Sequence, residues 1–330
     1  MCVDFMSRRG FLGFAAAAAA GVMTAGRSTE AAAQPAARPQ DMPTAGMIDF
    51  HVHTFPDAFE RTVSAVDAAR AARARGLRGI VLKGGAFETV TRAAEANATV
   101  PEVKTLGGVV LNWASGGINP AAVEAMANFR GGGSDKLGRV VWMPSMDSRN
   151  HYQRFNVQRQ PVEVFNGTNL VPAMNDVLAL CAKHDLVLET CHLAPPEALA
   201  LIRAAKAAGV KKIVCTHADY DPINMSLDDQ REAAKLGAFV EHAYIGVYLG
   251  PQSSTPRFRA WKGATVEQMA AAIKAVGASQ SILASDMGAA PLGVPAEGFA
   301  AFVKRLQELG VSDADLDLMA RRNPAMLLGI

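Results

Sequence analysis

The stretch Met47-Ile48-Asp49-Phe50-His51-Val52-His53 has the apolar character and residue alternation of a β-strand, and it ends in a His-x-His pair. Side chains on a strand alternate between two faces, so Asp49, His51 and His53 point the same way, and the two imidazoles lie about 7 Å apart along the backbone. That spacing is within reach of one metal ion, and neutral imidazole suits zinc and its first-row neighbours. The stretch therefore predicts a strand with two metal ligands; the alternative is a half-buried strand whose histidines only form hydrogen bonds.

Short apolar strands and helical segments alternate along the rest of the chain. The strands are expected at residues 47–53, 79–83, 106–112, 139–144, 186–192, 212–217, 238–244 and 281–286. Eight strand-and-helix units over roughly 280 residues match the size of an α/β fold of the (β/α)8 TIM-barrel type. Near-continuous apolar strands also suit a parallel sheet that helices cover. An open doubly wound sheet is the alternative, but no Gly-x-Gly-x-x-Gly turn follows the first strand.

Other candidate ligands stand at the ends of later strands. His192 ends the fifth expected strand, His217 the sixth and Asp286 the eighth. The C-terminal strand ends of a barrel meet on one face, where active sites of this fold lie. We therefore expect these side chains to converge with His51 and His53.

Lys83 ends the second strand, and the strand alternation predicts that it points into the same barrel mouth. An ammonium there would anchor a carboxylate or stabilise a developing oxyanion. The alternative is a strand-end lysine that extends to solvent.

A long polar connection at residues 145–168 interrupts the alternation of strands and helices. Connections of this length in a compact domain are usually functional, so we expect an active-site loop. Its residues Asp147, Arg149 and His151, together with Asn112 at the end of the third strand, are the expected substrate contacts. The cations Arg149 and Arg154 predict a small substrate that is acidic or strongly polar.

The ordered set of a His-x-His pair on the first strand, histidines on the fifth and sixth, and an aspartate on the eighth resembles the amidohydrolase superfamily of metal-dependent (β/α)8 enzymes. The resemblance covers residues 47–330. Three stretches are similar to motifs of the branch that contains decarboxylases and lactonases. They are Asp49-Phe50-His51-Val52-His53, Ala284-Ser285-Asp286 and Arg322-Asn323-Pro324-Ala325-Met326-Leu327-Leu328-Gly329. The chain as a whole resembles a bacterial subgroup whose reaction is not established.

This resemblance implies that His51, His53, His192 and Asp286 hold one divalent metal ion, most often zinc. His217 would complete the ligand set or polarise the substrate beside it. The metal ion would lower the pKa of a bound water from about 16 toward about 7. Asp286 would accept the proton of that water and return it to the leaving group.

One position departs from the superfamily members that bind two metal ions. Those members carry a carbamylated lysine or a glutamate at the end of the fourth strand, where this chain reads Met143-Pro144-Ser145-Met146-Asp147. A single ion is therefore expected. Lys83 and Glu189 leave a site for two ions open, and Asp147 is a weaker candidate.

The leading hypothesis is a metal-dependent hydrolase of an amide, lactone or ester bond. A metal-dependent decarboxylase with the same ligands is the second hypothesis, and a metal-binding or solute-binding protein without turnover is the third. Fold alone does not separate these functions.

The N-terminus has the pattern of an export signal. Ser7-Arg8-Arg9-Gly10-Phe11-Leu12 and the Ala-rich run to Val22 resemble a twin-arginine signal, and small residues at 31–33 offer a cleavage site. Residues 1–33 are the expected signal peptide, 34–45 a Pro- and Ala-rich linker, and 46–330 the barrel. The twin-arginine export machinery is then a partner and the periplasm the expected location. The apolar run is shorter than the ~20 residues of a spanning helix, so no stable membrane anchor is expected.

The composition and the cysteine count limit which partners and cross-links are expected. The chain has 330 residues, 50% of them hydrophobic, and a net charge of +2 with scattered cations, so a nucleic-acid partner is not expected. Cys181, Cys191 and Cys215 are an odd number after the signal, which predicts small buried residues rather than a disulfide framework. Whether the chain forms a homo-oligomer, and whether it starts at Met1 or Met6, stays open.

Overall fold

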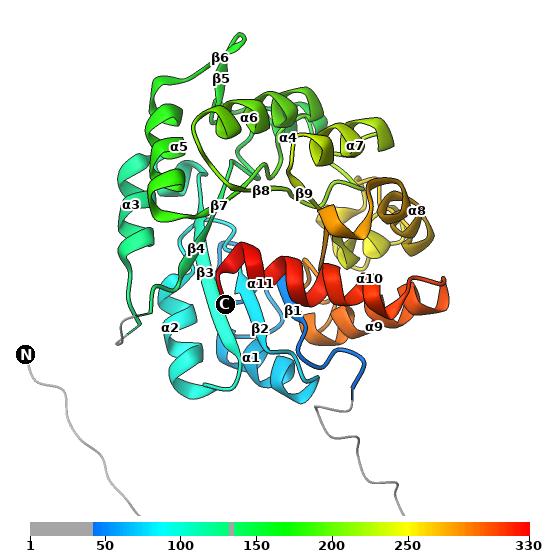
Figure 1. Ribbon diagram of the computed structural model, residues 1–330. Helices are drawn as coiled ribbons and strands as arrows, with labels where there is room; N and C mark the ends of the chain where they lie inside the picture. The colour runs from blue at the N-terminus through cyan, green and yellow to red at the C-terminus, as the bar shows by residue number, and fades with distance from the viewer. Residues whose placement is uncertain (1–41, 132–134) are drawn as a thin grey trace, which may run out of the picture. The chain divides into compact units, whose positions relative to one another are not determined.

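Strand β1 (Ile48–Val52) is the first of eight parallel strands in the computed structural model, which describes residues 42–131 and 135–330. The others are β2 (Gly79–Leu82), β3 (Lys104–Val110), β4 (Gly138–Trp142), β7 (Val187–Glu189), β8 (Lys212–Cys215), β9 (Phe239–Ala243) and β10 (Ser281–Ala284). Each strand pairs with the next in this order, and every pair is parallel. The expected (β/α)8 barrel is confirmed (Figure 1).

Backbone hydrogen bonds between the first and last strands close the ring. The amide of Asp286 donates to the carbonyl of His51 at 2.9 Å, and the amide of His53 donates to the carbonyl of Met287 at 2.9 Å. The carboxylate of Asp49 adds a third link, because its Oδ1 accepts from the amide of Ser285 at 2.8 Å. Closure therefore places the segment after β10 directly beside the His-x-His pair.

Helices surround the barrel and cover its outer face (Figure 1). They are α1 (Ala65–Ala74), α2 (Val90–Thr99), α3 (Pro120–Asn128), α5 (Pro172–His184), α6 (Pro195–Ala207), α7 (Leu227–Lys235), α8 (Val266–Val276) and α9 (Pro295–Glu308). Local signals set several of their ends. Asn119, for example, caps α3 with its side chain and Pro120 fills the first turn.

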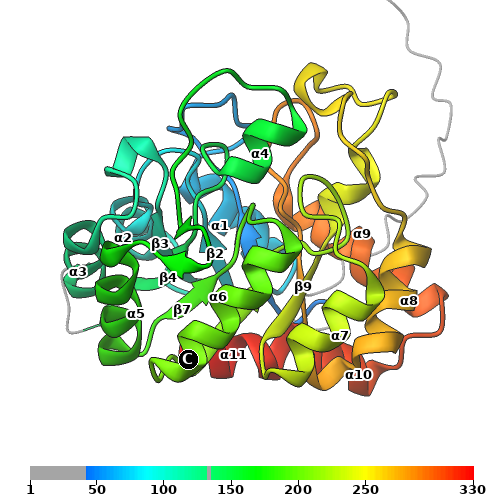
Figure 2. The ribbon, with the colours of Figure 1, turned by 90° about the horizontal axis from the view of Figure 1, so that it is seen from above.

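The two ends of the barrel are covered differently (Figure 2). The short helix α4 (Arg149–Arg154) and the yellow connection after β9 lie at the end where the strands finish. The opposite end is covered by α10 (Asp313–Asp317) and α11 (Asn323–Leu328). Asn323 fixes this end by donating to the carbonyl of Ser281 at 2.9 Å.

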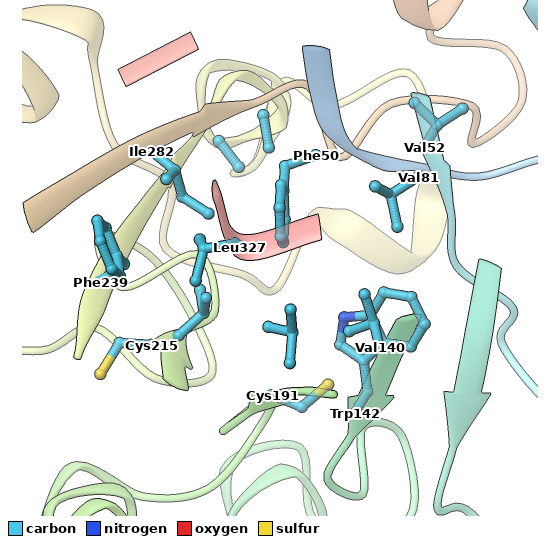
Figure 3. Close-up of a cluster of buried hydrophobic side chains, with 14 of the residues drawn as sticks. Phe50, Val52, Val81, Val140, Trp142, Cys191, Cys215, Phe239, Ile282 and Leu327 are labelled. Atoms are coloured by element: carbon cyan, nitrogen blue, oxygen red, sulfur yellow. The ribbon is translucent and has the colours of Figure 1, made fainter. Parts of the chain in front are cut away.

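A continuous cluster of buried apolar side chains forms the core. Phe50, Val81, Trp142, Ile282 and Leu327 belong to it, and each is at most 1% exposed (Figure 3). These residues come from four strands and from α11, so the cluster holds both the ring and its closed end together.

The connection at 145–168 is more ordered than the sequence predicts. It contains α4 and leads into a hairpin of β5 (Phe165–Asn166) and β6 (Asn169–Leu170). The hairpin occupies the chain up to Leu170, and the next helix, α5, begins at Pro172. Gly167, with φ 61°, opens the two-residue turn between Asn166 and Asn169 and favours a hairpin, and proline favours the first helical turn.

The N-terminal predictions fall mainly outside the described residues. The signal peptide at 1–33 and the linker up to residue 41 lie there, while the barrel belongs to one compact unit. In the described ranges, no helix has the length and apolar character needed to cross a membrane. Cys181, Cys191 and Cys215 are free and buried, as expected.

Candidate metal centre

His51, His53 and Asp286 meet at the end of the barrel where the strands finish. Nε2 of His51 lies 3.1 Å, and Nε2 of His53 lies 3.0 Å, from Oδ1 of Asp286. All three residues are buried, and their ligand atoms lie within 4.8 Å of one another. Of the five ligands expected from the sequence, the structure brings these three together most closely. They are called the metal trio below.

The outer nitrogens of the two histidines are held by other groups. Nδ1 of His53 lies 2.9 Å from the carbonyl oxygen of Lys83, which accepts only, so this nitrogen carries the proton. Nδ1 of His51 lies 3.0 Å from Oε1 of Glu241. Nε2 of His51 is buried without a hydrogen-bond partner. Both Nε2 atoms therefore face Asp286, and the proton on Nδ1 of His53 leaves the Nε2 lone pair of that ring free, as metal-ligating histidines require.

His217 and His192 lie next to the trio. The ring centroid of His217 is 5.9 Å from that of His51 and 5.1 Å from that of His192. Nδ1 of His217 is buried without a hydrogen-bond partner. Nδ1 of His192 instead lies 3.2 Å from Nδ1 of His151, on α4. The unpartnered nitrogens of His51 and His217 fit a cation better than they fit a metal-free core.

Three residues at the strand ends adopt a left-handed backbone. Cys191 follows β7 with φ 48°, His217 follows β8 with φ 29°, and Asp286 follows β10 with φ 50°. Residues with side chains rarely adopt this conformation, and such strain gathers at functional sites. Gly288 supports the same turn, because a Cβ there would lie 2.0 Å from the carbonyl oxygen of His53.

Two buried glutamates belong to the same network. Oε1 of Glu241 accepts from the amide of His217 at 3.1 Å, and Oε2 of Glu189 accepts from the hydroxyl of Thr216 at 2.7 Å. Each glutamate keeps one oxygen without a hydrogen-bond partner. Burial is the main reason that the pKa of each rises to about 8. His51, Glu189 and Glu241 form a second group of possible ligands within 4.8 Å.

Burial also sets the charge state of the ligands. It lowers the pKa of His217 to about 3 and that of His53 well below the ordinary value. These imidazoles are neutral at pH 7 and bind a metal ion without first losing a proton. Burial alone would raise the pKa of Asp286, but the electrostatic effect of the neighbouring imidazoles, first His51 and then His53, keeps it well below the ordinary value. The hydroxyl of Tyr220 donates to Oδ2 of Asp286 at 2.7 Å.

A cavity opens onto the trio. It contains about 500 Å³ of empty space, part of it open to solvent. His53, Asp286, His192, His217, Tyr220 and Lys83 form its polar floor, and its apolar wall includes Met146, Ile245, Leu249, Phe258 and Trp261. Lys83 is only 4% exposed. Its pKa is raised, because the acidic groups around it, first Cys191 and then Asp286, outweigh the opposing effect of burial.

The residues expected to contact substrate are placed elsewhere. Asn112 binds the carbonyl of Gly85 and the hydroxyl of Ser145, at 2.8 Å each. Asp147 accepts from the amide of Trp113 at 2.9 Å and from the hydroxyl of Tyr152 at 2.7 Å.

Arg149 is exposed and pairs with Glu163 at 2.7 Å, and Arg154 pairs with Asp221 at 2.6 Å. Neither arginine, nor Asn112 or Asp147, is among the residues that line the cavity. These four residues hold the connection at 145–168 in place, while His151 contacts His192 and Trp261, two residues that line the cavity.

Sequence reasoning missed four residues of the site. Glu241 carried a signal, because a charged residue within an apolar strand requires a partner. Nδ1 of His242 beside it lies 2.8 Å from Oδ2 of Asp219, while its Nε2 is buried without a hydrogen-bond partner. Tyr220, Arg61 and Arg257 come from irregular connections, where residue spacing predicts no direction.

Solved structures with a similar fold include several hydrolases. An amidohydrolase from Burkholderia multivorans with bound zinc has a TM-score of 0.56 and 17% identity, over 87% of this chain and 100% of that one. The organophosphorus hydrolase from Deinococcus radiodurans has a TM-score of 0.55 and 14% identity, over 87% and 93%. A putative 2-pyrone-4,6-dicarboxylic acid hydrolase from Pseudomonas putida has a TM-score of 0.53 and 17% identity, over 86% and 97%. At such identities the likeness establishes the shared fold.

The remaining comparisons concern sequence. None of the curated proteins matches the chain. The family of unknown function DUF6282 matches residues 46–241, and the chain belongs to this family.

Proposed function

We propose that this protein is a metal-dependent hydrolase of the amidohydrolase type that cleaves an amide, lactone or ester bond in a small polar or acidic substrate. The observation that carries the proposal is the metal trio at the floor of a cavity. Its two imidazoles are oriented by outer hydrogen bonds so that both Nε2 atoms lie within 3.1 Å of one carboxylate oxygen. The hydrolases among the structural neighbours agree with this proposal.

One divalent ion, most suitably zinc, would be held by His51, His53 and Asp286, with His192 and His217 next to it. Such an ion supplies Lewis acidity and lowers the pKa of water from about 16 to about 7. Asp286 is ionised and accepts a proton, while Tyr220 fixes its orientation through Oδ2. His217 is neutral and presents Nδ1 as a further ligand atom or as a contact to the substrate.

Lys83, which lines the same cavity, would also support hydrolysis. Its ammonium is buried, lines the cavity and stays charged at neutral pH. A fixed cation beside the metal trio stabilises the negative charge that develops on the oxygen of the attacked carbonyl group. We therefore assign to Lys83 the role of stabilising this oxyanion.

The test is the metal content of the mature protein purified without added metal. We expect about one equivalent of a divalent metal in the wild type and none in the double variant His51→Ala/His53→Ala. His184→Ala, which removes an imidazole at the end of α5, is the matched control and should keep the metal. Two equivalents would bring in Glu189 and Glu241 as ligands, and no metal in the wild type would contradict the proposal.

A hydrolysis screen of the metal-loaded protein then addresses the reaction. Amide, lactone and ester substrates with one acidic group are the first set. Consumption of water with release of the acid supports hydrolysis. Release of carbon dioxide without consumption of water would instead identify a decarboxylase with the same ligands.

We also propose export by the twin-arginine route, on the motif at Ser7-Arg8-Arg9-Gly10-Phe11-Leu12. In a bacterial host, the wild type should appear in the periplasm without its first ~33 residues. Arg8→Lys/Arg9→Lys should remain in the cytoplasm at full length. Equal export of both forms would contradict this route.

A further inference from the structure

Arg257 is a cation of the cavity wall, and in the part of the chain that the structure describes it forms no ion pair. It lies in the turn Pro256–Phe258, between β9 and α8, and lines the cavity. Its Nε is buried without a hydrogen-bond partner. Within residues 42–131 and 135–330, no carboxylate forms an ion pair with it. Burial and then the charge of Arg61 lower the pKa of Arg257 to about 10, so it stays charged at pH 7.

Two aromatic rings fix the position of this guanidinium. Its central carbon lies 4.8 Å from the ring centroid of Phe59 and 4.8 Å from that of Phe258. Cation–π contacts on two rings restrict the side chain before any ligand arrives. A restricted guanidinium loses little further freedom when it binds an oxyanion.

The neighbouring residue Arg61 is a cation of the same cavity wall that does have an acidic partner. Arg61 also lines the cavity, but its Nη2 lies 2.7 Å and its Nε 2.8 Å from Oδ2 of Asp57. Asp57 is in turn fixed by the amides of Ala58 and Gly85. Arg61 is therefore ion-paired within the protein, whereas Arg257 forms no ion pair with any carboxylate of the described residues.

We infer that Arg257 is the anion subsite of this cavity and binds a carboxylate group of the substrate. The edge of a guanidinium that carries Nε and one Nη presents two parallel donors, which match a carboxylate. Trp261, Phe258 and Leu249 would pack against the apolar body of that substrate. The substrate is then a small carboxylic acid whose scissile bond faces the metal trio. The role of this anion as part of a substrate rests on the proposed function.

The test is binding of benzoate to metal-free protein, measured by isothermal titration calorimetry. Wild type should bind benzoate, and Arg257→Gln should bind it at least tenfold more weakly. Arg257→Lys should be intermediate, because it keeps a charge over the rings but loses the two parallel donors. Lys262→Gln is the matched control, since it removes an exposed cation from the same connection and should bind like wild type.

Two further probes identify the ligand class. Benzamide has the same shape without the charge and should bind at least tenfold more weakly than benzoate. Phenyl phosphate that binds tenfold more tightly than benzoate would overturn the assignment to carboxylates. Circular dichroism and thermal unfolding of each variant show whether it is folded.

Three results would overturn the subsite itself. They are benzoate binding by Arg257→Gln equal to that of wild type, an equal loss in Lys262→Gln, and no binding of any probe to wild type. Because the benzoate titration uses metal-free protein, its result can be interpreted even if the metal proposal fails. Loss of binding in Arg257→Gln with unchanged metal content separates the two proposals.

Discussion

His53 shows how one hydrogen bond sets the chemistry of a ligand. The carbonyl of Lys83 holds the proton on Nδ1, so Nε2 presents a lone pair toward Asp286. Tyr220 plays the corresponding part for Asp286, because its hydroxyl donates to Oδ2 and leaves Oδ1 facing the imidazoles. Partners outside the ligand set therefore decide which atoms face the cation.

Replacing Tyr220 by Phe should weaken zinc binding by about tenfold, because partners of this kind contribute 10- to 100-fold to metal affinity. A competition titration with a chelator measures the dissociation constant. Tyr152→Phe is the matched control, since its hydroxyl binds Asp147 at 2.7 Å, away from the trio. Equal zinc affinity in wild type and Tyr220→Phe would contradict the role of Tyr220 in orienting Asp286.

At the scale of elements, the contact between β1 and β10 builds the site. Asp286 reaches His51 and His53 because backbone hydrogen bonds close the ring at this point. The chain must then pass close to His53, and Gly288 allows it with φ +116°. A glycine is required there for both its backbone conformation and its lack of a Cβ.

Gly288→Ala should lower the free energy of unfolding by about 3 kcal/mol or more, from backbone strain and a clash with the carbonyl of His53. Gly293→Ala separates the two causes, because φ there is +100° but a Cβ would meet nothing within 4 Å. That variant should lose only about 1–2 kcal/mol. Urea unfolding of both proteins is the measurement, and equal losses would argue against a clash at Gly288.

At the scale of the whole molecule, the barrel buries acidic groups that the surrounding hydrogen bonds satisfy only in part, since one oxygen of each has no partner. Glu189, Glu241 and Asp49 are 0% exposed, and burial is the main cause that raises the pKa of each. Such residues cost stability in a metal-free protein. A bound cation would offset that cost, so metal binding and stability are linked.

The metal-free protein should lose stability as the pH rises from 6.5 to 8. The pKa of Glu189 is about 8 when folded against 4.5 ordinarily, so the folded state keeps a proton that the unfolded state has released. The stability from this proton is complete below pH 4.5 and is lost as the pH rises through 8. Across pH 6.5–8, Glu189→Gln should gain about 1–2 kcal/mol relative to wild type in urea unfolding. Parallel pH profiles would contradict the raised pKa.

The sequence by itself determined the repeating strands and helices, the barrel and the positions of His51, His53 and Asp286. These are local properties, because apolar runs, caps such as Asn119 and residues at strand ends are visible in short windows. Strand alternation also placed Lys83 at the cavity floor. Asn112, at a strand end, and Asp147 and Arg149, in the long polar connection, are also expected at the substrate, whereas the structure has them bonded within or beside that connection.

Only the tertiary structure decided the rest of the site. Glu241 binds His51 across 190 residues, and Tyr220 binds Asp286 across 66. Arg257 comes from an irregular connection whose direction no periodicity sets. These contacts depend on how the ring closes and how the connections fold over its end. No short window of sequence contains both partners, so the barrel had to be assembled before the outer partners of the metal trio and the wall of its cavity could be identified.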